Sequence, residues 1–192
     1  MTITIAQPVP AKNGKSALLL NNNAAWIEKN GPGKSTPFRP NSFDEGNDAA
    51  RVACSIIAEG DLAEWAQSTD EQLIAIISAN SAFYLGKEMT EDQIRAAHCP
   101  LYRTHEKYSA SVKCKVNRQG PRSTRFWTQN GERTTEIEDW TMCNFAPRLW
   151  LKSVWITPGA RQRGVSLEMT DVQVTETSQE CPFEVTDTDP FA

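Results

Sequence analysis

The sequence has little of what catalysis, a metal centre or a membrane span requires. Its 192 residues include only two histidines and five cysteines, and no two cysteines form a C-x-x-C pair, so neither a zinc ribbon nor a disulfide framework is indicated. The common hydrolase, phosphate-loop, metalloprotease and dinucleotide motifs are absent. No stretch of about 18 apolar residues occurs, and the first twelve residues lack the basic and apolar regions of an export signal. We therefore predict a protein without enzyme activity, cofactor or membrane span.

A few side chains could in principle ligate zinc, namely His98, Cys99, His105 and Cys114. Sulfur and nitrogen are the usual zinc ligands in proteins. The spacing of these residues matches no standard zinc module, however, and Cys114 alternates with Val112 and Val116 as a core residue of a strand would. We therefore predict no metal site.

The net charge of −4 hides an uneven distribution. From Glu176 onward the chain has five acids and no Lys or Arg, which leaves residues 1–175 with a net charge of +1. Between Val112 and Arg163, ten cations face four acids. A basic segment is thus followed by an acidic tail, and cations are what binding to phosphate requires.

Hydrophobic periodicity divides the rest of the chain into three parts. Residues 1–46 are rich in Pro, Gly and Asn and predict one or two strands joined by a long loop. Residues 47–99 predict three or four short helices, the first capped by Asp48 and running through Glu59. The later helices would begin at two capping boxes, Ser68-x-x-Glu71 and Thr90-x-x-Gln93.

After Pro100 the apolar period changes to two, which is typical of strands. The expected strands cover residues 108–117, 123–137, 148–156 and 164–174, and Asn130-Gly131 predicts a hairpin within the second of these segments. The alternation changes phase in the last strand, which places a β-bulge near Thr170-Asp171. Together the segments favour about five antiparallel strands in a small barrel or sandwich with a helical insertion.

Aromatic and cationic residues share one face of these strands. By parity, Arg148, Trp150 and Lys152 point away from Leu149 and Leu151, whereas Trp155 shares the parity of the two leucines and is assigned to the core. Similar cationic faces carry Lys113, Lys115, Arg125 and Trp127. Such a face suits single-stranded nucleic acid, because bases stack on aromatic rings while cations hold the backbone. The alternative is that the tryptophans are core residues and the cations only solvate the sheet.

The loop from Thr157 to Arg163 adds two cations, Arg161 and Arg163. Loops at the rim of a small barrel are common nucleic-acid contacts. A merely solvated hairpin loop would have the same composition. We expect both arginines to contact phosphate.

Three segments resemble the bacteriophage replication single-stranded-DNA-binding proteins: residues 107–116, residues 148–174 and the final sequence PFEVTDTDPFA. The shared features include Gly164-Val165-Ser166-Leu167 and the pair Val172-Gln173. The resemblance implies an α+β, mainly β fold: an OB-fold-like five-stranded antiparallel barrel with a helical insertion at about 47–99. It implies one domain over residues 1–175 and an acidic disordered tail over 176–192. It also implies a cytoplasmic location in an infected bacterium.

In that family the acidic tail competes with DNA and recruits replication or recombination proteins. Here the resemblance implies that Phe191 anchors in a partner, with Asp187 and Asp189 beside it. A plain solubilising terminus is the alternative. For the whole protein, the alternative to single-stranded DNA binding is a structural or protein-interaction β-domain, such as a virion component or a host-defence antagonist.

Overall fold

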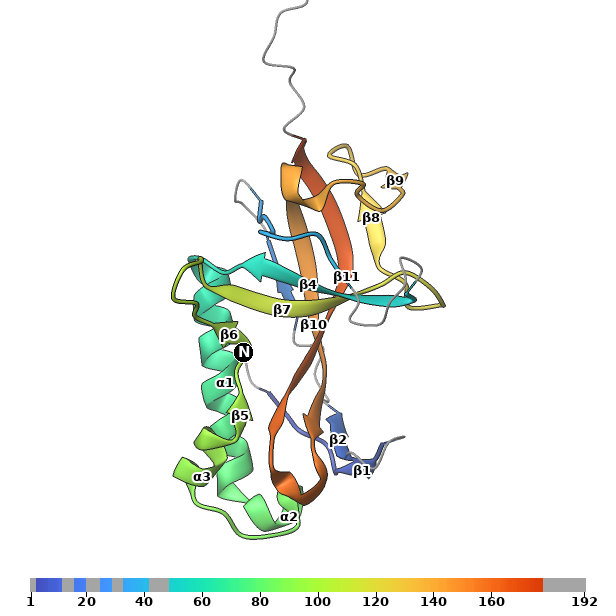
Figure 1. Cartoon of the computed structure of the whole chain (residues 1–192). Helices are drawn as coiled ribbons and strands as arrows, with labels where there is room; N and C mark the ends of the chain where they lie inside the picture. Colours follow the sequence, from blue (N-terminus) through green and yellow to red (C-terminus); the bar gives the residue numbers. More distant parts are fainter. Residues whose placement is uncertain (1–2, 12–15, 20–24, 29–32, 42–48, 178–192) are drawn as a thin grey trace, which may run out of the picture.

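The computed structural model describes residues 3–11, 16–19, 25–28, 33–41 and 49–177. Its sheet contains eleven strands and carries a group of helices on one side (Figure 1). The strands are β1 Val9–Pro10, β2 Ser16–Leu19, β3 Ala25–Ile27, β4 Arg51–Ile57, β5 His98–Cys99, β6 Tyr102–Arg103, β7 Ser111–Asn117, β8 Arg125–Trp127, β9 Arg133–Thr134, β10 Cys143–Ile156 and β11 Arg163–Thr177. The helices are α1 Asp61–Ala79, α2 Ser81–Leu85 and α3 Glu91–Ala96, with two short 3-10 turns at Trp140–Met142 and Pro158–Ala160. The mostly-β class with a few helices is as predicted.

The sheet is organised around the long β10–β11 hairpin, in which β10 and β11 pair antiparallel almost from end to end. The main strand order is β1-β2-β10-β11-β7-β4, and it is an open path among the described strands. Strands β5, β7 and β8 run parallel to β11. The predicted antiparallel arrangement of about five strands is therefore only partly correct, because three strands pair parallel with β11 and such short pairings are not visible in local sequence patterns.

Residues 33–41 connect β10, in the middle of this path, with β4, at one end of it. Lys34 exchanges backbone hydrogen bonds with Phe145 of β10, at 2.7 and 2.9 Å. Asn41 does the same with Ala53 of β4, at 3.0 and 2.7 Å. The segment thus runs from the hairpin to the far strand of the sheet.

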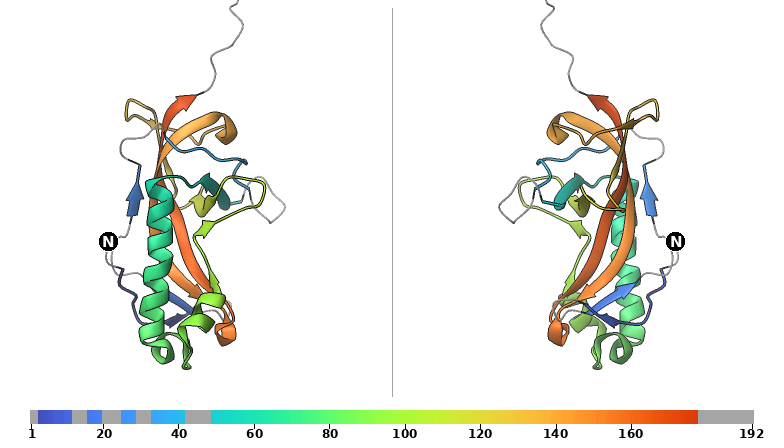
Figure 2. Two further views of the ribbon diagram at one scale, coloured as in Figure 1. Left: turned by 90° about the vertical axis from the view of Figure 1, so that its left-hand side faces the viewer. Right: turned by 90° about the vertical axis from the view of Figure 1, so that its right-hand side faces the viewer.

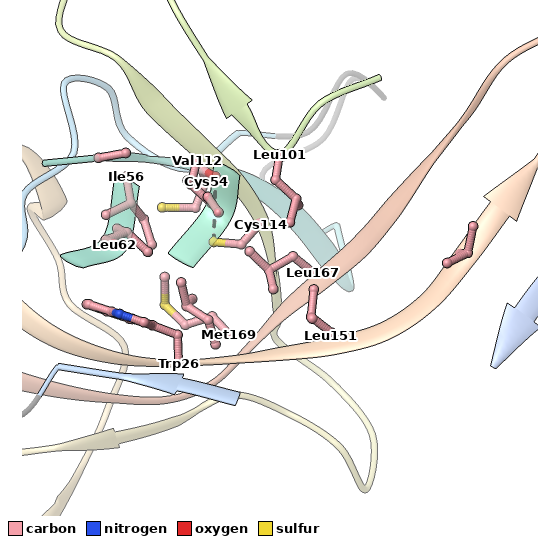
Figure 3. Packing of buried hydrophobic residues seen from close by; sticks show 14 of the residues in the cluster. Trp26, Cys54, Ile56, Leu62, Leu101, Val112, Cys114, Leu151, Leu167 and Met169 are labelled. Atoms are coloured by element: carbon pink, nitrogen blue, oxygen red, sulfur yellow. Dashed lines mark hydrogen bonds between the residues drawn. The ribbon is translucent and has the colours of Figure 1, made fainter. Parts of the chain in front are cut away.

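The inner faces of the strands form one hydrophobic core (Figure 3). Leu151, Leu167 and Met169 of the hairpin meet Val112 and Cys114 of β7 there. Helix α1 adds an apolar stripe at helical spacing, formed by Leu62, Ala66, Leu73, Ile74 and Ile77. Helix α1 contacts β6 and β7, and Figure 1 and Figure 2 show it as a long helix on one side of the molecule. The opposite, outer face of the sheet is left for the polar and aromatic residues.

The predicted helix from Asp48 to Glu59 is wrong, because residues 51–57 form strand β4. Val52, Cys54 and Ile56 are buried on alternate positions, and this period of two is the pattern of a strand with one face in the core. Helix α1 begins at Asp61, so the expected capping box at Ser68 lies inside it. The capping box of Thr90 and Gln93 is confirmed at the start of α3.

Gly33 is placed where a side chain would not fit. Its φ is +91°, and a Cβ there would lie 2.5 Å from Thr175 Oγ1 and 3.0 Å from the Phe145 nitrogen. We predict that Gly33→Ala lowers the free energy of unfolding by about 1–3 kcal/mol more than Gly120→Ala does, measured by urea denaturation. Gly120 is the matched control, because its φ is +87° but a Cβ added there would have no atom within 4 Å. Equal losses in the two variants would contradict the close packing of residues 33–41 on the hairpin.

Candidate functional site

The outer face of the sheet gathers most of the residues predicted from the sequence. Backbone register places Lys115 of β7 beside Glu168 of β11, and Glu168 beside Trp150 of β10. A second row places Arg125 of β8 beside Asp171 of β11, and Asp171 beside Arg148 of β10. Long-range pairing thus brings the separate strand faces together into one surface, which we call the ribbon face.

Glu168 is the centre of the first row. Its side chain is only 3% exposed, yet it forms ion pairs with Lys152, at 2.6 Å, and with Arg51. The pKa of Lys115 lies below its ordinary value, because partial burial disfavours the charged form and Arg51, Lys152 and Lys113 add repulsion that Glu168 only partly offsets. Several cations therefore crowd around one carboxylate, and this crowding is the electrostatic setting in which a further anion is attracted.

Asp171 is the centre of the second row. Its carboxylate accepts hydrogen bonds from Arg125, at 2.8 Å, and from Trp127 Nε1, at 3.1 Å, while Arg148 lies 3.8 Å away. Burial raises the pKa of Asp171, but the hydrogen bonds from Arg125, Trp127 and Thr170 outweigh it, so the pKa is below its ordinary value. The carboxylate fixes the orientation of the Trp127 ring and holds two guanidinium groups next to it.

Trp127 and Trp150, the two tryptophans predicted to bind bases, are half-buried, and each has a guanidinium over its ring. Arg122 lies 5.9 Å from the ring centroid of Trp150, and Arg133 lies 5.2 Å from that of Trp127. Trp127 and Arg148 also line a shallow pocket of about 320 Å³. Stacked aromatic and cationic groups of this kind can bind a flat ring that carries a nearby negative charge.

Trp155 is not a core residue, contrary to the sequence-based prediction. The register of β10 and β11 shifts between Leu151 and Ser153, where β10 carries one extra residue. A shift by one residue exchanges the two faces of a strand. Trp155 therefore points to the outer face with Trp150 and is half-buried. The predicted bulge at Thr170-Asp171 is confirmed by the neighbouring register shift, at which Arg148 pairs with Asp171 and Leu149 with Met169.

The two arginines of the hairpin loop have different environments. Arg161 is exposed, as predicted. Arg163 is the first residue of β11 and is 0% exposed, so its expected place on an exposed loop is wrong. No hydrogen-bond partner for its three guanidinium nitrogens is found among the described residues, and burial lowers its pKa. Arg163 pairs with Ile156 in the register and so shares its inner face, which excludes it from the ribbon face.

The residues considered as zinc ligands are engaged separately. His98 Nε2 lies 2.8 Å from Asp70 Oδ1, and His105 Nε2 lies 2.9 Å from Ser111 Oγ. The Cys114 thiol is buried against the Cys54 carbonyl (Figure 3). Within the ranges that the structure describes, no group of three or more His, Cys, Asp or Glu residues could hold a metal ion. Likewise, none of the helices in those ranges is long and apolar enough to cross a membrane.

The acidic tail cannot be placed on this surface. Asp187, Asp189 and Phe191 lie outside the described residues. The last described strand, β11, ends at Thr177.

Several residues of the ribbon face were missed from the sequence: Arg51, Arg122, Arg133, Glu168 and Asp171. Glu168 and Asp171 did carry a signal, because both flank apolar residues of a strand predicted to be half-buried. Arg51 was missed because its segment is expected, from sequence, to be a helix. Arg122 and Arg133 lie beside the tryptophans only through loops whose course no periodicity reveals.

The sequence matches no protein-family model and no curated protein. Among solved structures, the chain is similar to a single-stranded DNA-binding protein from bacteriophage Enc34, with a TM-score of 0.48 and 11% identity over 94% of this chain and 98% of that chain. It is also similar to the single-stranded DNA-binding protein from bacteriophage Enc34 in complex with ssDNA, with a TM-score of 0.46 and 8% identity over 92% of this chain and 94% of that one. The function of the ribbon face is therefore inferred from its own geometry.

The depressed pKa of Asp171 has a consequence for stability. A carboxyl whose pKa is lower in the folded than in the unfolded protein stabilises the fold above the unfolded-state pKa, about 3.9 for Asp, and loses this contribution as the pH falls through the folded-state pKa. We predict that Asp171→Asn lowers the free energy of unfolding by about 1.5–3 kcal/mol at pH 7, the range for hydrogen bonds to a charged group. The difference from wild type should shrink below about pH 4, measured by urea unfolding between pH 7 and pH 2.5. A difference that is constant across this range would contradict the assigned role of the carboxylate.

Proposed function

We propose that the protein binds single-stranded DNA on the ribbon face, with little dependence on base sequence. One observation carries the proposal: Trp127 and Trp150 are half-buried on the same outer face, and each has a guanidinium over its ring. A base can stack on an aromatic side chain for about 1–3 kcal/mol, whatever its identity. The cations between the two rings are placed to contact the phosphates that join successive bases.

Stacking of this kind favours single strands over duplex. In a duplex the faces of the bases are already stacked on each other, so a tryptophan on a sheet surface cannot reach them without breaking pairs. A single strand offers every base to the protein. Contacts to phosphates alone would not distinguish the two forms in this way.

The carboxylates of the ribbon face are compatible with phosphate binding. Glu168 and Asp171 each hold two or more cations on the surface, which reduces the freedom that those long side chains lose when DNA binds. A phosphate near Lys115 would also relieve the repulsion that lowers its pKa. In this proposal Arg51, Lys113, Lys115, Arg122, Arg125, Arg133, Arg148, Lys152 and Arg161 supply the positive potential.

The narrower parts of the proposal come from the sequence resemblance. We infer an OB-fold-like binding domain that acts in phage DNA replication or recombination, in the cytoplasm of an infected bacterium. We also infer that the acidic tail competes with DNA and recruits replication or recombination proteins through Asp187, Asp189 and Phe191. A binding role rather than catalysis follows from the same inference.

We predict that the protein binds a single-stranded oligonucleotide more tightly than duplex of equal length, measured by fluorescence anisotropy. Trp150→Ala should weaken that binding by about 1–3 kcal/mol, or roughly 5- to 150-fold, with little change in the thermal midpoint. Phe83→Ala is the matched control, because Phe83 is an aromatic residue 49% exposed on α2, away from the ribbon face, and its loss should leave the affinity unchanged.

Equal or tighter binding to duplex would contradict the proposed function. Absence of nucleic-acid binding would instead favour the structural or protein-interaction alternative. If Trp150→Ala unfolds the protein while affinity per folded molecule is retained, Trp150 is a packing residue.

Deletion of residues 186–192 tests the tail. An acidic segment tethered to a basic surface competes with DNA at high effective concentration, so its removal should tighten DNA binding. The gain should be largest at low salt and shrink as screening increases, measured by anisotropy over about 10–200 mM salt. Full-length protein with Asp187→Asn and Asp189→Asn should show the same trend, whereas Phe191→Ala should retain normal DNA affinity. Unchanged or weaker binding at low salt after the deletion would exclude competition.

A further inference from the structure

A basic pocket opens where strands β7 and β11 separate. The two strands pair only at Glu168–Lys115 and Met169–Val116, and beyond this point they diverge. Residues 98–103 cross the gap, pairing with β11 at one end, as β5, and with β7 at the other, as β6. The resulting pocket has a volume of about 390 Å³, within the range of small-ligand sites.

One wall of the pocket is Trp155, which the register shift after Leu151 turns to the outer face. Its ring lies directly on the backbone of Gly164, the residue opposite it on β11. A Cβ at Gly164 would be 2.7 Å from Trp155 Cζ2 and 3.0 Å from the Cys99 oxygen, so any other residue there would displace the ring. Because residue 164 is a glycine, the Trp155 ring can lie against the backbone of β11 at the edge of the pocket.

The other wall is cationic. Arg103, Lys113 and Lys115 line the pocket, and no carboxylate is among the described residues that do so. Of these three cations, Lys115 also belongs to the first row of the ribbon face, where it lies beside Glu168. An aromatic wall opposite three cations fits a flat, neutral ring joined to an anion.

The pocket continues the line of the proposed binding face. Trp127, Trp150 and Trp155 lie beside Gln173, Glu168 and Gly164 of β11, respectively. At about 3.3 Å per residue along a strand, the partner residues on β11 are about 17 Å apart for the first two tryptophans and about 13 Å apart for the second and third. The three rings thus follow one strand at intervals that a single chain of nucleotides can span.

We propose that this pocket binds one unpaired nucleotide of the DNA strand, with its base stacked on Trp155 and its phosphate on Arg103, Lys113 and Lys115. The inference rests on the proposed function. It extends that function by a third base-binding position, near the loop that joins β10 to β11. The strand would run along β11 from Trp127 past Trp150 and into the pocket.

Trp155→Ala and Trp155→Phe test the pocket in anisotropy titrations with oligo-dT of increasing length. Long oligonucleotides should bind Trp155→Ala about 5- to 150-fold more weakly than wild type, whereas Trp155→Phe, which retains a ring, should lose less. Shorter oligonucleotides, which can bind at Trp127 and Trp150 without entering the pocket, should lose less affinity. The length at which affinity stops rising should therefore be shorter for Trp155→Ala.

A second variant covers the case in which Trp155→Ala lowers the thermal midpoint. Arg103 is exposed, so Arg103→Gln should fold normally while reducing the log–log salt slope of binding by about 0.7. Lys87→Gln is the control of equal charge change, because Lys87 lies between α2 and α3 and does not line the pocket.

The possible outcomes separate the two proposals. If wild type and Trp150→Ala behave as proposed but Trp155→Ala and Arg103→Gln match wild type at every length, the pocket is not a nucleotide site and only this inference is overturned. If wild type binds no single-stranded DNA, the proposed function is wrong and the pocket's role is overturned with it.

Discussion

The pairing of β10 with β11 determines the layout of the molecule. Each of the other sheet strands except β1, β4, β6 and β9 pairs directly with one of these two. The pairing contains three register shifts, and each changes which side chains face the core. The shift between Leu151 and Ser153 has the largest effect, because it turns Trp155 outward. A hairpin with perfect alternation would bury this ring, and the ribbon face would then have no aromatic residue near the loop that joins β10 to β11.

The second organising feature is a pair of carboxylates on β11. Glu168 is almost fully buried on a face that is otherwise cationic and aromatic. A buried carboxylate is tolerated only when several donors surround it, and here Arg51 and Lys152 supply them from strands on opposite sides. Asp171 has the same relation to Arg125 and Arg148. The cations of the outer face are thus held at fixed positions by charges from the central strand.

Local patterns were sufficient for features that depend on nearby residues. The Asn130-Gly131 hairpin, the Thr90 capping box and the bulge at Thr170-Asp171 follow from residues a few positions apart, and all three are present. The parity of Arg148, Trp150 and Lys152 was also correct, because the register shift after Arg148 adds its extra residue to β11, and the shift that changes the phase of β10 comes only after Leu151.

Features that depend on distant partners could not be predicted in this way. The extra residue after Leu151 leaves no mark in the composition of β10, so parity alone assigns Trp155 to the wrong face. Arg163 was expected in solvent because loops are usually polar, but pairing with Ile156 and the Ala97 carbonyl draws it into the interior. Strand β4 was hidden by a run of alanine and polar residues that also suits a helix.

The central position of β11 affects the order in which the protein can fold during synthesis. β11 is the last strand in the described chain, yet β5, β7, β8 and β10 all pair with it. The ribosome synthesises these four strands before β11, so each of them has one unpaired edge until β11 is available. Contacts between residues far apart in sequence form slowly, and unpaired strand edges are prone to aggregation. The nascent chain therefore has a period of vulnerability that ends only when residues 163–177 have left the ribosomal tunnel.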